Sequence, residues 1–176
     1  LLSQGSTTVE AKSGYGLDLA SERKQLEVVA RTGARADLPR LVPTYLALHA
    51  LPPEANGDRD RYAARVLAED LPAIAEAGLA RFVDAYVDRS AFSVAQAQPV
   101  LERARALGLG VRIHIGQFAD VGGAALAAAV GAASADHLEH VDAAGAIQLA
   151  RAGVRAVLLP VASFTLAQAP PPVALL

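Results

Sequence analysis

The feature that most constrains the fold is an alternation of short β-favouring runs with helix-favouring segments, repeated about six times along 176 residues. The β-favouring runs are "TTVEAK", "RLVPTYLALHA", "ARFVDAYVD", "VRIHI", "SADHLEH" and "RAVLLP". Alternation with short links predicts parallel strands joined by helical crossovers. A doubly wound sheet and a (β/α)8 barrel both satisfy this pattern. No G-x-G-x-x-G motif follows the first run, which weakens the dinucleotide-binding version. Six units therefore favour a TIM-type (β/α)8 barrel that is incomplete in this chain.

Capping residues and prolines indicate where the elements begin and end. Asp18, Ser93 and Asp142 stand directly before helical patterns, where their side chains can cap the first turn. Pro72 is expected to kink or divide the helix in "DRYAARVLAEDLPAIAEAG". Pro43 indicates that its strand starts there or lies at an edge of the sheet. The tail after residue 161 has no regular pattern and is expected to be irregular.

Composition excludes several classes of function. The net charge of −2 gives no basic field for nucleic acid and no polybasic signal for a membrane surface. Cysteine is absent, which rules out disulfide and thiolate chemistry within this sequence and fits a reducing cytoplasm. No apolar run approaches the roughly 20 residues that span a bilayer. The sequence has no methionine and ends on "PPPVALL", so we expect a piece of a longer protein.

All four histidines fall at or just after a predicted strand end. His49 closes the second of the β-favouring runs, His114 closes the fourth, and His137 and His140 bracket the fifth. In a βα barrel the functional groups gather at the carboxyl ends of the strands. Each histidine also has a structural interpretation, as a core histidine, a turn histidine or an Asp–His hydrogen-bonded pair. The pair Glu139–His140 is expected to form a solvated loop edge.

The first predicted strand adds further polar groups near the same end. It carries Glu10 and Lys12, and Tyr15 follows it. The first two can be explained as a local ion pair. No H-x-H or H-E-x-x-H set occurs in the chain, so no metal-binding motif is present. The residues alone therefore predict a hydrolase-like βα barrel with histidines at its mouth.

Several blocks, in their order and separations, resemble imidazolonepropionase, an amidohydrolase-superfamily enzyme of histidine degradation. They are "TTVEAKSGYGL", "LHALPPE", "GDRDRY", "VRIHIGQ", "SADHLEH" and "VLLPVASFTL". The resemblance implies hydrolysis of 4-imidazolone-5-propanoate to N-formimidoyl-L-glutamate, by opening a C–N bond of a five-membered ring. It also implies one zinc or iron ion, a (β/α)8 barrel with a small β-domain, a small-molecule substrate and, often, a homodimer.

The resemblance assigns roles to five residues. The position of His114 is a metal ligand, and the position of His137 is an active-site histidine near the attacking water. Tyr15, His49 and Gln117 match residues that contact the substrate. Metal-activated water and proton transfer by a second histidine are consistent with this residue set.

The sequence also departs from the family pattern. Gly116 stands where the family has an acidic residue, and Val87 and Asp88 stand where it commonly has Cys and Glu. The family's H-x-H pair, its metal-binding aspartate and its small β-domain have no counterpart in residues 1–176. We therefore expect residues 1–176 to form a single partial βα-barrel domain that lacks bound metal and activity in isolation.

Two alternatives remain open at this point. The first is another cyclic amidase or deaminase of the amidohydrolase superfamily. Such enzymes commonly add a carboxylated lysine, and no lysine follows Lys24 in this sequence, which argues against a lysine-bridged two-metal site. The second is a non-catalytic relic or a solute-binding βα domain, for which Gly116 is the only positive sign.

Overall fold

The computed structural model describes residues 1–176 and contains one sheet of six parallel strands. The strands are β1 (Thr8–Lys12), β2 (Arg40–Leu48), β3 (Phe82–Val87), β4 (Gly110–Ile115), β5 (Ser134–His137) and β6 (Arg155–Val157). The predicted six-fold alternation of strands and helices is confirmed.

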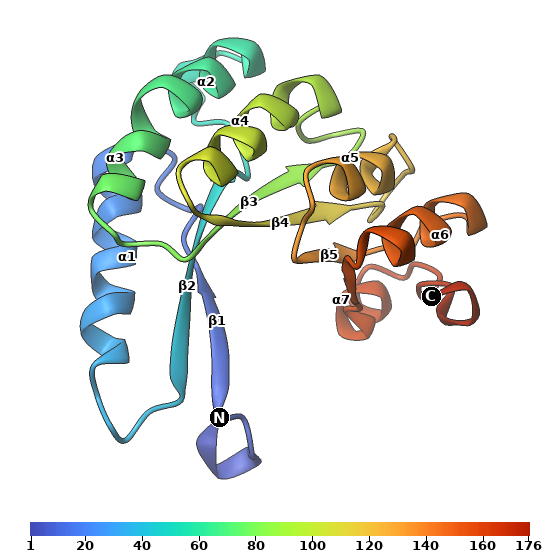
Figure 1. Cartoon of the computed structure of the whole chain (residues 1–176), viewed down its shortest axis with the longest axis horizontal. Coiled ribbons are helices and arrows are strands. Elements are labelled where there is room, and N and C mark those ends of the chain that lie inside the picture. Colours follow the sequence, from blue (N-terminus) through green and yellow to red (C-terminus); the bar gives the residue numbers. More distant parts are fainter.

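The order of the strands decides between the two predicted architectures. A doubly wound sheet reverses its strand order at a switch point, whereas this sheet runs β1-β2-β3-β4-β5-β6 without reversal. Right-handed crossovers between successive strands place their helices on the same face of the sheet. Figure 1 shows the strands curling, with α1 to α6 around the outside. The fold is therefore an incomplete α/β barrel, as the sequence predicted.

Seven α-helices accompany the sheet. They are α1 (Leu19–Gly33), α2 (Arg59–Arg65), α3 (Leu71–Glu76), α4 (Val94–Ala106), α5 (Gly123–Ala129), α6 (Ala143–Ala152) and α7 (Pro160–Thr165). The predicted caps are confirmed, because Asp18, Ser93 and Asp142 each accept a backbone N–H in the first turn of α1, α4 and α6. None of the helices is long and apolar enough to span a membrane.

Pro72 divides a helical stretch, as predicted. A π-helical turn over Val66–Asp70 separates α2 from α3. Pro72 lies in the first turn of α3 and has no N–H to donate to the preceding turn, and the wider π-helical turn before it accommodates this loss.

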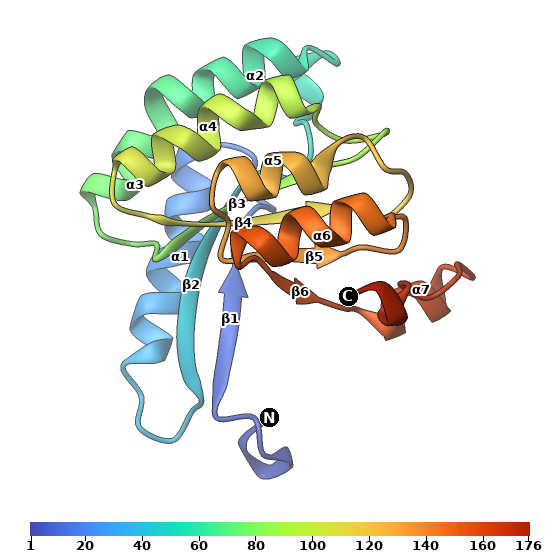
Figure 2. The same cartoon turned by 45° about the vertical axis from the view of Figure 1, so that its right-hand side comes forward.

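Two sequence-based expectations about the elements are wrong. Pro43 is the fourth residue of β2, which lies between β1 and β3. It is tolerated because the β2–β3 ladder starts only at Thr44, and Pro43 contacts the chain before β3 through its carbonyl oxygen, which accepts the Arg81 N–H at 2.9 Å. The tail is also not wholly irregular, because Pro160 opens the short helix α7 (Figure 2).

The hydrophobic core lies between the sheet and its surrounding helices. In β3 and β4 the core residues alternate along each strand, and each is at most 2% exposed: Val83, Ala85, Val87, Val111, Ile113 and Ile115. Because side chains alternate between the two faces of a strand, the residues between them point to the concave face. That face is the interior of the incomplete barrel, and it is polar.

Candidate functional site

Polar side chains from five neighbouring strands meet on the concave face. This concave cluster consists of Glu10, Lys12, Thr44, Asp84, Arg112, His114, Ser134 and Asp136. The parallel register aligns these polar residues across neighbouring strands: Asp84 lies beside Arg112, and His114 lies beside Asp136.

The Lys12 ammonium group lies at the centre of the concave cluster. Its Nζ atom is 2.5 Å from Asp84 Oδ2, 3.2 Å from Asp136 Oδ2 and 3.4 Å from Glu10 Oε2. Burial alone would lower the pKa of Lys12, but the carboxylates of Asp84 and Asp136 outweigh it and raise the pKa above its ordinary value. The expected local pair of Glu10 and Lys12 is therefore one part of a larger network. The argument against a lysine-bridged two-metal site considered only the residues after Lys24, so it did not consider Lys12, which lies inside the cluster.

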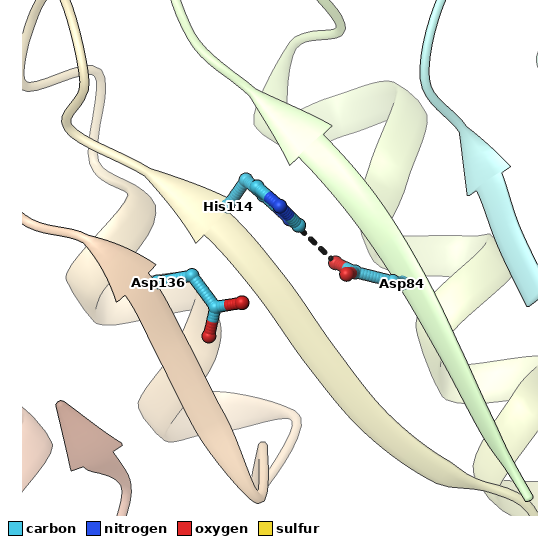
Figure 3. A group of neighbouring side chains, drawn as sticks. All are labelled: Asp84, His114 and Asp136. Atoms are coloured by element: carbon cyan, nitrogen blue, oxygen red, sulfur yellow. Dashed lines mark hydrogen bonds and ion pairs between the residues drawn. The ribbon is translucent and has the colours of Figure 1, made fainter. Parts of the chain in front are cut away.

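Asp84 links Lys12 to the histidine of the same cluster. Its side chain is fully buried. Its Oδ1 atom lies 3.0 Å from His114 Nδ1, and its Oδ2 atom faces Lys12 (Figure 3). Burial would raise the pKa of Asp84, but His114 and Lys12 lower it below its ordinary value. Asp84 is therefore a buried, ionised carboxylate with both oxygens engaged.

The remaining members of the concave cluster hold each other in place. Asp136 Oδ1 accepts a hydrogen bond from the Ser134 hydroxyl at 3.0 Å. Arg112 lies 3.1 Å from Glu10 Oε1 and donates to Ser134 Oγ at 3.2 Å. The Thr44 hydroxyl donates to Glu10 Oε1 at 2.6 Å. Each carboxylate of the cluster thus has at least two polar partners.

Three members of the cluster have the chemistry of metal ligands. One donor atom each from Asp84, His114 and Asp136 lies within 4.8 Å of the others (Figure 3). Imidazole nitrogen and carboxylate oxygen are donors that zinc and iron both take. The sequence predicted His114 but missed the two aspartates as members of this set. The signal that could have found them is the two-residue spacing of polar groups in "FVDAYVD" and "SADH".

His137 lies next to His114, with 5.5 Å between the ring centroids. It is the last residue of β5 and is 6% exposed. His137 and Leu138 have φ angles of +82° and +68°, a left-handed conformation that costs free energy in residues other than glycine. Burial and His114 lower the pKa of His137, although Glu139 opposes this shift. His137 is therefore a neutral imidazole near neutral pH.

The expectation that Glu139 and His140 form a solvated loop edge is wrong for Glu139. Its side chain is 1% exposed, and it accepts a hydrogen bond from the Ser163 hydroxyl of α7 at 2.8 Å. Its Oε2 atom lies 3.6 Å from His137 Nδ1. His140 is exposed. Helix α7 covers Glu139, and the sequence pattern gave no sign of this contact across 24 residues.

Tyr15 and His49 form a second pair of predicted residues. Their rings meet edge-on with 5.0 Å between centroids. His49 Nδ1 lies 2.7 Å from the Gly14 carbonyl oxygen. Because a carbonyl oxygen only accepts hydrogen bonds, Nδ1 must carry the proton, which leaves Nε2 free as an acceptor. Gly14 has a φ of +104°, and a Cβ there would lie 2.7 Å from Leu46, so this turn requires glycine.

Gly116 and Gln117 follow the end of β4. Gly116 has a φ of +64°, a left-handed conformation that glycine adopts readily, just after His114. Gln117 is half-buried just beyond that turn. The structure thus joins His114 to His137 and Tyr15 to His49, both at carboxyl ends of strands. That all of them serve one substrate cavity remains a prediction.

Comparison with known proteins adds a sequence relationship to this geometry. No family model matches the chain. An imidazolonepropionase from Methylobacterium sp. (strain 4-46) is 56% identical over 160 residues, covering 91% of this chain and 40% of the relative. Imidazolonepropionases from Symbiobacterium thermophilum and Myxococcus xanthus are 49% and 50% identical, covering 94% and 97% of this chain. The resemblance to imidazolonepropionase is confirmed. The chain spans about 40% of the length of the imidazolonepropionases it matches.

Solved structures support the fold. A Xaa-Pro dipeptidase with bound methionine in its active site aligns with a TM-score of 0.60 at 17% identity, over 86% of this chain and 41% of the dipeptidase. An uncharacterized protein aligns with a TM-score of 0.57 at 15% identity, over 99% of this chain and 48% of that protein. At these identities the likeness concerns the fold alone, and it agrees with the incomplete barrel of this imidazolonepropionase-like chain.

Proposed function

We propose that this chain supplies catalytic residues to a hydrolase of histidine degradation that converts 4-imidazolone-5-propanoate to N-formimidoyl-L-glutamate. The observation that carries the proposal is the position of His114. It lies in a partly buried cluster of side chains that can bind a metal ion, on the inner face of a barrel sheet, in a chain up to 56% identical to imidazolonepropionases. The activity of the whole protein is part of this proposal, since the chain spans about 40% of those relatives.

The donor chemistry around His114 fits a zinc or iron ion. His114 is half-buried and offers an imidazole nitrogen to such an ion beside the negative charge of Asp84 and Asp136. A catalytic zinc takes about three protein ligands, and we propose that the others come from the rest of the natural-length protein. When bound, such an ion activates a water molecule as the nucleophile and polarises the oxygen under attack. His114 is the ligand that we assign to this chain.

His137 is proposed to move a proton during ring opening. A neutral imidazole can accept a proton from the attacking water and return it to the leaving nitrogen. His137 is suited to this role, because burial keeps its pKa low and its ring lies 5.5 Å from that of His114. Its N–H can also stabilise the oxyanion that develops on the carbonyl.

Tyr15, His49 and Gln117 are proposed to bind the substrate. The Tyr15 side chain is exposed and its hydroxyl can donate to a carboxylate or carbonyl oxygen. His49 presents an unprotonated Nε2, which can accept from a ring N–H. Gln117 offers both a donor and an acceptor for the imidazolone ring.

The test is turnover of 4-imidazolone-5-propanoate by the protein at its natural length, with the product measured by mass spectrometry. We expect turnover by the wild type, near-complete loss in His114→Ala, and little change in His140→Ala, which removes an exposed imidazole. A metal-loaded wild type without turnover, or a His114→Ala variant with full activity, contradicts the proposal.

A further inference from the structure

We propose that Asp84 is a positioning residue that fixes the His114 imidazole so that Nε2, and not Nδ1, is the atom that binds the metal. This inference rests on the proposed function, because it assigns an orienting partner to the proposed ligand. It concerns a carboxylate that the sequence pattern did not single out.

Hydrogen-bond chemistry fixes which nitrogen carries the proton. An ionised carboxylate only accepts hydrogen bonds, so the 3.0 Å contact between Asp84 Oδ1 and His114 Nδ1 requires a proton on Nδ1. A neutral imidazole has a single N–H, so Nε2 then carries the free lone pair. Metal-binding histidines generally donate their second N–H to a carboxylate or carbonyl in this way.

Asp84 is poorly placed to be a direct ligand itself. Its side chain is fully buried, with Oδ1 directed to His114 and Oδ2 to Lys12. Asp136 is similarly engaged, by Ser134 and Lys12, and its side chain is 7% exposed. The His114 side chain is 17% exposed, the most accessible of the three. Of these three side chains, the imidazole is therefore the one most open to an incoming ion.

Lys12 completes the arrangement by restraining Asp84 from the other side. The ammonium group contacts Asp84 Oδ2, while Oδ1 faces the imidazole, so rotation of the carboxylate breaks at least one charge-assisted hydrogen bond. Figure 3 shows Asp84 and His114 pointing toward one another from adjacent strands. The imidazole is thereby oriented before any metal binds.

The experiment uses the protein at its natural length, labelled with ¹⁵N-histidine, and records long-range ¹H–¹⁵N spectra at about pH 8, where histidine is mostly neutral. The His114 signal is assigned from its absence in His114→Gln. We expect Nδ1–H in the wild type and a clear shift toward Nε2–H in Asp84→Asn. The control is Asp88→Asn, the same change at a buried aspartate that follows the same strand and accepts backbone N–H groups of Arg89 and Phe118. This control should keep the wild-type spectrum.

A titration with Zn²⁺ alone extends the test. We expect the His114 Nε2 signal to change on binding, and Asp84→Asn to weaken Zn²⁺ binding by about 10–100-fold. An Nε2–H tautomer in the wild type, or an unchanged tautomer in Asp84→Asn, overturns the inference. If the wild-type protein has the Nδ1–H tautomer and binds Zn²⁺ through Nε2 but does not turn over imidazolone propionate, the proposed function, and not this inference, is overturned.

Discussion

Replacing Lys12 with methionine removes the one ammonium group that three carboxylates share. The concave cluster contains Glu10, Asp84 and Asp136 against Lys12 and Arg112, so the substitution leaves three negative charges facing one positive charge. Removing one partner of a buried ion pair costs about 3–5 kcal/mol. Because the Lys12 side chain is 20% exposed, we expect the lower end of that range, about 3 kcal/mol.

Urea unfolding measures this effect directly. With a slope of about 2–3 kcal/mol per molar urea for a chain of this size, the midpoint should fall by about 1 M or more. The control is Lys24→Met, the same change at the only other lysine, which is exposed on α1. Its effect should stay within about 0.5 kcal/mol.

A double variant separates charge from packing. Adding Asp84→Asn to Lys12→Met removes one of the uncompensated buried charges, so the two changes together should destabilise less than the sum of their separate effects. Equal stability of Lys12→Met and Lys24→Met would refute the reasoning that Lys12 neutralises the cluster.

Three further predictions concern other parts of the chain. Gly110→Ala should cost about 1–3 kcal/mol in thermal unfolding, because its Cβ would lie 2.5 Å from the Phe82 ring; an unchanged Tm contradicts this. Ser93→Ala should cost about 1 kcal/mol in urea unfolding, since it breaks the capping box of α4; no loss would show that the cap is dispensable. Glu139→Gln should lower kcat for imidazolone propionate with KM little changed, because the carboxylate adjoins His137; a change in KM alone opposes this role.

The parallel barrel architecture could be predicted because it depends on local patterns. Strand runs, caps such as Asp18 and Ser93, and the helix division at Pro72 are encoded within a few residues of each feature. Pro43 misled the prediction because its tolerance depends on where β3 starts to pair, which is a property of sheet register.

The candidate site was predictable in part for the same reason. His114, at the end of a strand, could be found from its position, but its contact with Asp84 joins residues 30 positions apart. Lys12 and Asp136 are 124 positions apart and meet only because the sheet curls. Glu139 was mistaken for a surface residue because α7, which buries it, had no recognisable pattern in the sequence.

The most direct test of the central claim is a crystal structure of the natural-length protein grown with Zn²⁺, with the ion located by anomalous scattering. The account predicts an anomalous peak about 2.0–2.1 Å from His114 Nε2, with Asp84 still bonded to Nδ1. A zinc ion seated between Asp84 and Asp136 in place of the Lys12 ammonium, or bound away from His114 altogether, would contradict it.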